Sequence, residues 1–168
     1  DRFVDKLAVR IAALKLGPAS DEASNIGPMI NAKAVDKIER HVKDAVAGGA
    51  RVVVGGQRVS ALGPNYFAPT LLVGTNATMA CSCEETFGPV APLFRFRDER
   101  EAIAIATGTP FGLAAYFYTR DLACAWRVGP TGVAGARLPQ GDDGHARQRR
   151  DAFAAAGEAE MLGGRRLD

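Results

Sequence analysis

Residues 1–128 predict an α/β fold in which helices flank a mostly parallel sheet. Apolar residues recur at helical spacing in two separate segments of this region. Short runs of β-branched and aromatic residues, bounded by glycines, alternate with these segments. A strand, a helix and a second strand also fit within roughly 30 residues near the end of the region, the length of one right-handed βαβ unit. Together these patterns indicate one coherent α/β layer.

Two amphipathic helices are predicted in the first third of the chain. The first ends near Gly17, and its apolar stripe consists of Phe3, Leu7, Ile11 and Leu14. The second follows Asn31, whose side chain can accept a backbone N–H, and it stops at Gly48. Its buried stripe is expected to be Val35, Ile38, Val42 and Val46. His41 falls beside this stripe and is expected on the helix surface, because nothing nearby in the sequence could join it in a site.

Three strand-like runs follow these helices. Residues 51–56, "RVVVGG", predict a short β-branched strand closed by glycines. Residues 66–74, "YFAPTLLVG", predict another, which Pro69 pushes toward a sheet edge or a bulge. In residues 90–98 two phenylalanines alternate with two arginines over the second half, so one side of this strand is expected to face a core.

The last part of the α/β region predicts two more helices around a buried strand. Asp98 and Glu101 form a start like a capping box for the helix "EREAIAIATG". Residues 113–119, "LAAYFYT", are almost all apolar, which is typical of a strand covered on both faces. Asp121 can cap a final short helix, "LACAWRV".

Composition narrows the possible classes of function. The net charge of +2 and the lack of a basic stripe argue against a nucleic-acid partner. No apolar run approaches the roughly 18 residues that a membrane span needs, and the first residues do not resemble a secretory signal. The chain has three cysteines, of which Cys81 and Cys83 lie too close together for an easy disulfide. Reduced thiols and a cytoplasmic location are therefore expected.

Residues 129–168 differ from the rest of the chain. They are dominated by Gly, Ala and Arg, contain no lysine, and have Phe153 as their one aromatic residue. Such a segment cannot bury enough apolar surface to offset the entropy of ordering it. The sequence therefore predicts an irregular, disordered or loosely attached tail. A frameshift near the codon of Val128 would produce the same composition and stays open as an alternative.

Several segments in residues 1–128 resemble the aldehyde dehydrogenase superfamily, and its succinate-semialdehyde dehydrogenase branch most closely. The most specific match is the "EETFGPV" motif at residues 84–90. Four further segments match in the family's order: "DRFVDKLAVRIAALKLG", "GPMINAKAVDKIERHVKDAVAGGARVVVGG", "YFAPTLLVG" and "FGLAAYFYTRDLACAWRV". The resemblance implies that residues 1–128 are a C-terminal part of the family's catalytic domain, and that residues 129–168 diverge from it.

The resemblance also implies a cofactor contact in this motif. In the family the second glutamate, here Glu85, accepts hydrogen bonds from the ribose hydroxyls of NAD or NADP, and the aromatic residue, here Phe87, packs beside the nicotinamide. A carboxylate suits the first task because it only accepts hydrogen bonds and can take two hydroxyls at once. Glu84 should point the other way along an extended backbone and be solvated or structural. The alternative interpretation is a solvated turn with Phe87 in the core.

No catalytic residue and no metal site is expected in this chain. In the family the nucleophilic cysteine, the general-base glutamate and the dinucleotide-binding Rossmann domain precede the matched segment. Cys81 and Cys83 are poor substitutes, because nearby negative charge raises the pKa of a thiol. Two cysteines also cannot complete a structural zinc site, which needs four ligands.

The sequence therefore predicts a fragment of an NAD(P)-dependent aldehyde dehydrogenase. The parent enzyme, which the resemblance implies is a homo-oligomer, would oxidise a small aldehyde such as succinate semialdehyde to the carboxylic acid through a cysteine thiohemiacetal. The isolated chain is expected to be inactive. The sequence leaves open the choice between NAD and NADP, because the selecting residue would lie in the Rossmann domain. It also leaves open a second class of function, a non-catalytic α/β interaction module that binds a partner chain through an exposed sheet edge.

Overall fold

The computed structural model describes residues 2–109, 111 and 116–129. They belong to two compact units, Asp1–Arg95 and Phe96–Asp168, and each unit is treated by itself. The irregular tail predicted for residues 129–168 lies outside the described residues, apart from Gly129, and stays a prediction. Among the described helices, none is both long enough and apolar enough to cross a membrane.

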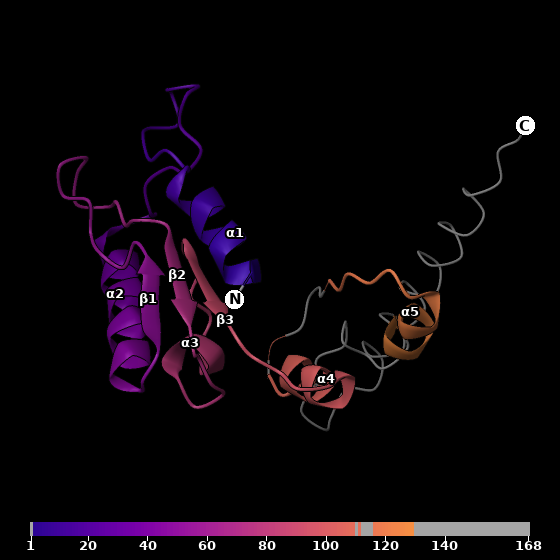
Figure 1. The fold of residues 1–168 in the computed structure, drawn as a ribbon. Helices are drawn as coiled ribbons and strands as arrows, with labels where there is room; N and C mark the ends of the chain where they lie inside the picture. Colours follow the sequence, from indigo (N-terminus) through magenta and orange to yellow (C-terminus); the bar gives the residue numbers. More distant parts are fainter. Residues whose placement is uncertain (1, 110, 112–115, 130–168) are drawn as a thin grey trace, which may run out of the picture. The chain divides into compact units, whose positions relative to one another are not determined.

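A small mixed sheet forms the centre of the first unit (Figure 1). Its three strands lie in the order β1 (Arg51–Val54), β2 (Thr70–Val73), β3 (Val90–Leu93). β1 pairs antiparallel with β2, and β2 pairs parallel with β3. The α/β class is confirmed, but the described sheet is mixed rather than mostly parallel. The reason is that no helix separates β1 from β2, so the chain returns antiparallel, with a further bridge between Arg58 and Phe67.

Helix α2 (Ala32–Ala47) supplies the core of this unit. Its buried apolar residues are Val35, Ile38, Val42 and Ala45, and they pack with Ala50, Phe67, Leu72 and Met79. The predicted stripe is confirmed for its first three members. Val46 is instead 47% exposed, because Ala45 follows Val42 by three residues and so shares its helix face.

The ends of α2 follow the predicted chemistry. The side chain of Asn31 accepts a hydrogen bond of 2.9 Å from the backbone N–H of Ala34, which satisfies one of the free donors at the helix start. Gly48 closes the other end, and Gly49 has a φ of 97°, a conformation that glycine adopts without strain. These two ends determine the length of the helix, and so the length of its buried face.

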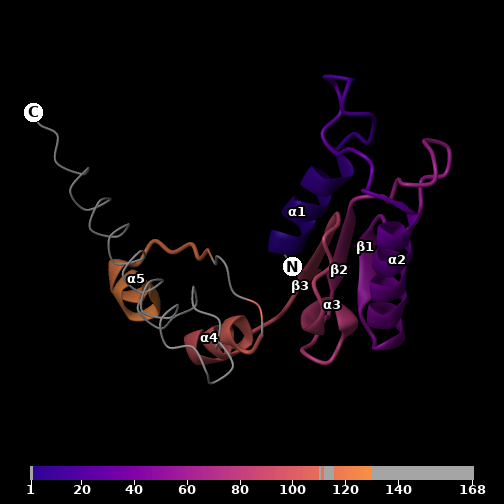
Figure 2. The same ribbon diagram turned by 180° about the vertical axis from the view of Figure 1, so that it is seen from behind.

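Helix α1 (Arg2–Ala12) contacts β1 and β2. Figures 1 and 2 show the sheet lying between α1 and α2. Leu7 and Ile11 are half-buried, whereas Phe3 is 64% exposed, so only the middle of the predicted stripe is covered.

Two strand predictions need correction. Of the sheet edge or bulge predicted from Pro69, the edge is wrong, because Pro69 immediately precedes β2, the central strand of the described sheet. The pairing of β1 with β2 does contain an irregularity, between Val52 and Val54. The strand predicted for residues 90–98 ends at Leu93, and Phe96 is 60% exposed. The alternation of Phe and Arg after Leu93 does not form a strand, because the pairing of β3 with β2 ends at Leu93.

In the second unit the predicted helix caps are present. Asp98 accepts a hydrogen bond from the backbone of Glu101 at the start of α4 (Glu99–Thr107), and Asp121 does the same for Ala123 at α5 (Leu122–Val128). The carboxylate of Glu101 accepts from the backbone N–H of Arg97, one residue earlier than in a standard capping box. Arg127 makes two hydrogen bonds to Glu99, which tie α5 to α4.

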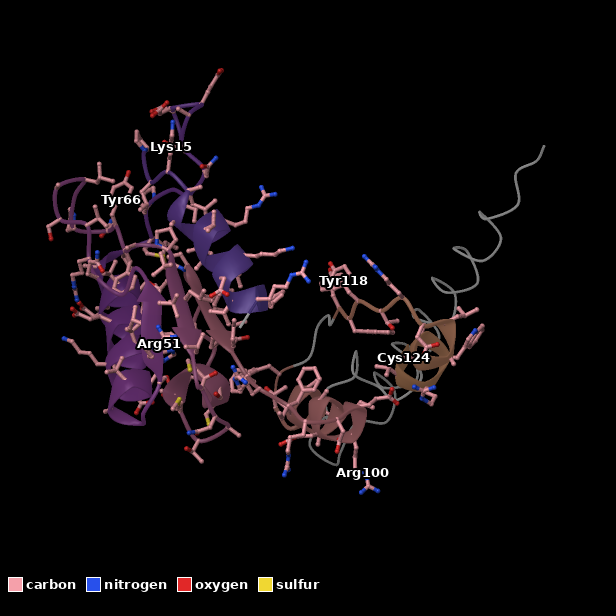
Figure 3. All side chains as sticks on the ribbon, viewed as in Figure 1. Lys15, Arg51, Tyr66, Arg100, Tyr118 and Cys124 are labelled. Carbon is pink, nitrogen blue, oxygen red and sulfur yellow. The ribbon has the colours of Figure 1, made fainter. Side chains whose placement is uncertain are left out.

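The buried strand predicted at residues 113–119 is not found in its described part. Residues 113–115 lie outside the described residues, and residues 116–119 have no regular structure. Tyr118, labelled in Figure 3, is 95% exposed. No described strand pairs with residues 116–119, and Tyr116 is 83% exposed, so this part lacks the covering layers that the prediction assumed.

A substitution at Gly55 tests whether the turn after β1 requires a glycine. It has a φ of 72°, and a Cβ at this position would meet the carbonyl oxygen of Pro69. We expect Gly55→Ala to lower the free energy of unfolding by about 1–3 kcal/mol, because both the backbone angle and the close backbone contact oppose a side chain. Urea denaturation of the chain would measure this change.

Gly27→Ala is the matched control, since no atom lies within 4 Å of a Cβ there. Equal stability of the two variants would contradict the role given to Gly55.

Candidate functional site

The predicted site residues lie in the loop between α3 (Ala80–Cys83) and β3. The backbone of Glu84 is extended, with φ −124° and ψ 149°. Successive side chains of an extended chain point in opposite directions. Glu84 and Thr86 accordingly contact α2, whereas Glu85 and Phe87 are exposed to solvent.

Glu84 is bound to α2 by two side chains. The guanidinium of Arg40 donates two hydrogen bonds to its carboxylate, at 3.1 and 2.6 Å, and Nε2 of His41 lies 3.2 Å from Oε2. The hydrogen bonds from Arg40, and next those from His41, lower the pKa of Glu84 to about 2. Of the two roles left open for this residue, the structure supports the structural one.

His41 corrects the sequence analysis. The side chain is fully buried rather than on the helix surface, and its Nδ1 lies 3.1 Å from Oγ1 of Thr86. Its partners are 43 and 45 residues away in the sequence, which is why reasoning from neighbouring residues missed them. One signal was available: His41 follows Ile38 by three residues and so shares the buried face of α2.

The end of the loop is packed against the core. A Cβ at Gly88 would collide with the side chain of Ile38, so only glycine lets the backbone approach α2 this closely. The carbonyl oxygen of Pro89 accepts a 2.7 Å hydrogen bond from the backbone N–H of Thr70. The chain bends at Gly88 and Pro89 and enters β3 at Val90, as the sequence predicts.

Phe87 is held in a strained conformation. Its φ is 45°, and among the described residues it is the one non-glycine residue with a positive φ. Its ring is 78% exposed, so burial of the ring does not compensate the strain. The expected alternative with Phe87 in the core is therefore wrong. Strained exposed residues of this kind often mark ligand-binding sites.

Glu85 lies between Glu84 and Thr86, the two residues that bind α2. It is exposed, and within the described part of the chain no hydrogen bond or ion pair engages its carboxylate. Its two oxygens are therefore available as acceptors for a ligand, since no ion pair with another described residue has to break first.

The thiol of Cys81 is not activated toward a thiolate. All three cysteines are free thiols. Burial is the main cause that raises the pKa of Cys81, and Asp44 adds a smaller contribution, so burial outweighs the neighbouring charge that the sequence analysis emphasised. Cys83 donates a hydrogen bond to the carbonyl oxygen of Ala77. Within the described residues, no group of three or more His, Cys, Asp or Glu side chains could hold a metal ion.

A shallow apolar groove of about 220 Å³ lies beside the same loop. Its lining comes from α1, the loop after it, β2, β3 and the bend before β3: Ile11, Leu14, Ile26, Pro69, Thr70, Gly88, Pro89, Val90 and Ala91. Neither Glu85 nor Phe87 lines it. The groove and the exposed pair therefore share the loop backbone but are separate features.

The low pKa of Glu84 predicts a pH dependence of stability. The pKa is about 2 in the folded chain and 4.5 ordinarily, so the ionised carboxylate stabilises the fold above about pH 4.5, and this stabilisation is lost as the pH falls toward 2. We expect the chain to be more stable than Glu84→Gln at pH 6, and the difference to shrink between pH 4.5 and 2. Denaturant titrations at several pH values would measure it.

Arg40→Met provides the control for this measurement. Without the guanidinium, the same Glu84→Gln substitution should have a smaller effect at pH 6. Unfolding curves whose separation does not change with pH would contradict the assignment.

The strain at Phe87 predicts the order of stability of two variants. Phe87→Gly and Phe87→Ala both remove the ring, but only glycine adopts a φ of 45° freely. We expect the glycine variant to be more stable than the alanine variant by about 1 kcal/mol. Thermal unfolding monitored by circular dichroism would measure the difference, and an alanine variant at least as stable as the glycine variant would show that the residue is not strained.

Comparisons with known proteins indicate the family of the chain. Residues 1–136 match the family model described as the aldehyde dehydrogenase family. Over 129 residues the chain is 53% identical to the NADP(+) succinate-semialdehyde dehydrogenase of Escherichia coli, covering 77% of this chain and 27% of that protein. It is 49% identical over 128 residues to the glutarate-semialdehyde dehydrogenase of Pseudomonas putida, covering 76% and 26%.

Solved structures show the same relationship. An NADP-dependent enzyme of E. coli matches with a TM-score of 0.77 and 51% identity, over 81% of this chain and 28% of that one. A Mycobacterium tuberculosis aldehyde dehydrogenase complexed with NAD+ matches with a TM-score of 0.74 and 32% identity, over 83% and 28%. The chain thus spans about a quarter of the length of the curated relatives described above. On the family match and these identities, the chain belongs to the aldehyde dehydrogenase family.

Proposed function

We propose that this chain provides the loop that contacts the nicotinamide half of the cofactor in an NAD(P)-dependent semialdehyde dehydrogenase. Glu85 would accept hydrogen bonds from the ribose hydroxyls, and Phe87 would pack beside the nicotinamide. The observation that carries the proposal is the two-sided loop: Glu84 and Thr86 bind α2, whereas Glu85 and Phe87 face outward in a chain of this family.

The chemistry of the exposed pair fits such a cofactor. A carboxylate without an internal partner can accept from two neighbouring hydroxyls. A phenyl ring that is 78% exposed loses contact with water when a planar group lies against it. The rigid backbone around Phe87 limits where that ring can be, so the cofactor would meet a prepared surface.

The bound cofactor would accept a hydride from the aldehyde, and the described residues would bind and orient it. None of these residues is proposed as the nucleophile or the general base, because the thiol of Cys81 has a raised pKa and Cys83 is bonded to the backbone. We place the cysteine nucleophile and the Rossmann domain elsewhere in the complete protein. No step of aldehyde chemistry is assigned to the isolated chain.

The named relatives suggest the substrate class. The two curated proteins described above are named for succinate semialdehyde and glutarate semialdehyde, small molecules with an aldehyde at one end and a carboxylate at the other. We propose a semialdehyde of this type as the substrate of the complete protein, with succinate semialdehyde as the first compound to test.

The alternative, a non-catalytic interaction module, has less support. Its motivation was an exposed sheet edge, and within the described residues β1 and β3 are indeed the edges of the sheet. However, those edges do not explain why Phe87 is both strained and exposed. A cofactor-facing loop explains this feature as well as the exposed carboxylate of Glu85 beside it.

Glu85→Gln tests the proposed function in a complete enzyme, obtained by placing residues 1–128 in the corresponding region of the E. coli succinate-semialdehyde dehydrogenase. The amide keeps the size of the side chain but weakens its acceptance of two hydroxyls. We expect the KM for NAD or NADP to rise about tenfold or more, since hydrogen bonds to a charged group are the stronger ones. Initial rates at varied cofactor concentration would measure it.

Glu22→Gln is the matched control, because Glu22 is an exposed glutamate on a different loop. A cofactor KM that is unchanged by Glu85→Gln would remove Glu85 from the proposed role.

A further inference from the structure

The loop that carries the exposed pair depends on one buried polar residue. His41 is fully buried in the apolar face of α2, yet both of its ring nitrogens lie next to polar atoms of the loop. Nδ1 is 3.1 Å from Oγ1 of Thr86, and Nε2 is 3.2 Å from Oε2 of Glu84. The imidazole therefore bridges two loop residues that flank Glu85 on either side.

We infer that His41 is a positioning residue, which through Thr86 and Glu84 determines that Glu85 and Phe87 are the side chains presented to the cofactor. This inference rests on the proposed function. The backbone of Glu84 is extended, so the side chains of Glu84 and Glu85 point in opposite directions. With Glu84 and Thr86 fixed against α2, Glu85 and the positive-φ Phe87 are the exposed residues.

The hydrogen-bonding capacity of the three groups makes this arrangement specific. An ionised Glu84 only accepts, so its contact requires an N–H at Nε2. In the neutral ring Nδ1 is then an acceptor, and the hydroxyl of Thr86 can donate to it. Arg40 lies 3.3 Å from Nε2 but only donates, so its stronger bond is the 2.6 Å one to Glu84. Glu84, Thr86 and both ring nitrogens then each have a partner of the right polarity, whereas Arg40 and Nε2, both donors, do not bond to each other.

Burial makes the bridge costly to break. A ring nitrogen without a partner in a fully buried site loses its contact with water and gains nothing in return. If the loop moved away from α2, both ring nitrogens would lose these partners at once. Gly88, which packs against Ile38 three residues before His41 on α2, constrains the loop from its other end.

The test has a functional arm in the hybrid enzyme described above. Thr86→Val keeps the shape of the side chain but removes the hydroxyl, and His41→Leu removes both ring nitrogens. We expect each to raise the cofactor KM about three- to tenfold, the effect of losing one or two hydrogen bonds, with kcat changed less than about twofold. His41→Gln, which keeps an amide donor that can reach Glu84, should recover part of the loss.

Thr78→Val is the matched control, because Thr78 is an exposed threonine whose hydroxyl bonds to Asn76 rather than to His41. If Thr86→Val behaves like Thr78→Val while Glu85→Gln still raises the cofactor KM, the inference is overturned and the proposed function stands. If His41→Leu lowers thermal stability but leaves the cofactor KM unchanged, His41 fills the core and nothing more, which also overturns it.

A structural arm separates the inference from the proposed function. Amide hydrogen exchange of Glu84 and Thr70, whose N–H groups bond to Ala80 and to Pro89 at the two ends of the loop, reports in the full chain whether the loop is held, with no cofactor present. We expect Thr86→Val to accelerate this exchange and Thr78→Val to leave it unchanged. Should Glu85→Gln fail to affect the cofactor KM, this arm decides alone: faster exchange supports the anchoring by His41, and unchanged exchange refutes it.

Discussion

The burial of one face of α2 is the constraint on which the first unit depends. Its apolar residues, with Ile38 and Val42 at their centre, pack against β2 and against Met79 in the turn before α3. The same helix holds polar elements in place: Asp44 accepts the backbone N–H of Ala80 at the start of α3, and Arg40 binds Glu84 directly after it. One helix therefore contributes to the core and also binds the loop. A change in its packing is expected to shift the loop that carries Glu85 and Phe87.

This arrangement explains how a short loop can carry strain. Phe87 keeps a positive φ although its ring is exposed, so the strain must be sustained by the residues around it. On one side Thr86 and Glu84 bind α2, and on the other Gly88 packs against Ile38. Anchors on both sides of a strained residue oppose its local relaxation. Rigidity of this kind lowers the entropy lost when a ligand binds.

Part of the candidate site could be predicted from the sequence. The different roles of Glu84 and Glu85 followed from the alternation of side chains along an extended backbone, and the bend at Gly88 and Pro89 followed from the residue types. The spacing from Ile38 indicated that His41 is buried, but its polar partners could not be predicted, because they approach only after the chain has passed through β1, β2 and α3. The assignment of Glu85 and Phe87 to a cofactor still rests on the family resemblance together with their exposure.

What the sequence by itself determined is local: the helix caps at Asn31, Asp98 and Asp121, the glycine ends of α2 and β1, and most of the buried face of α2. These features depend on interactions within one or two turns of chain, which residue type and spacing specify. Only the tertiary structure decided that the sheet is mixed, that β3 ends at Leu93 and that His41 is buried beneath the loop. Each of those features depends on which distant segments of the chain come into contact. A helical or alternating pattern shows which side chains share one face of an element, but not which other element packs against that face.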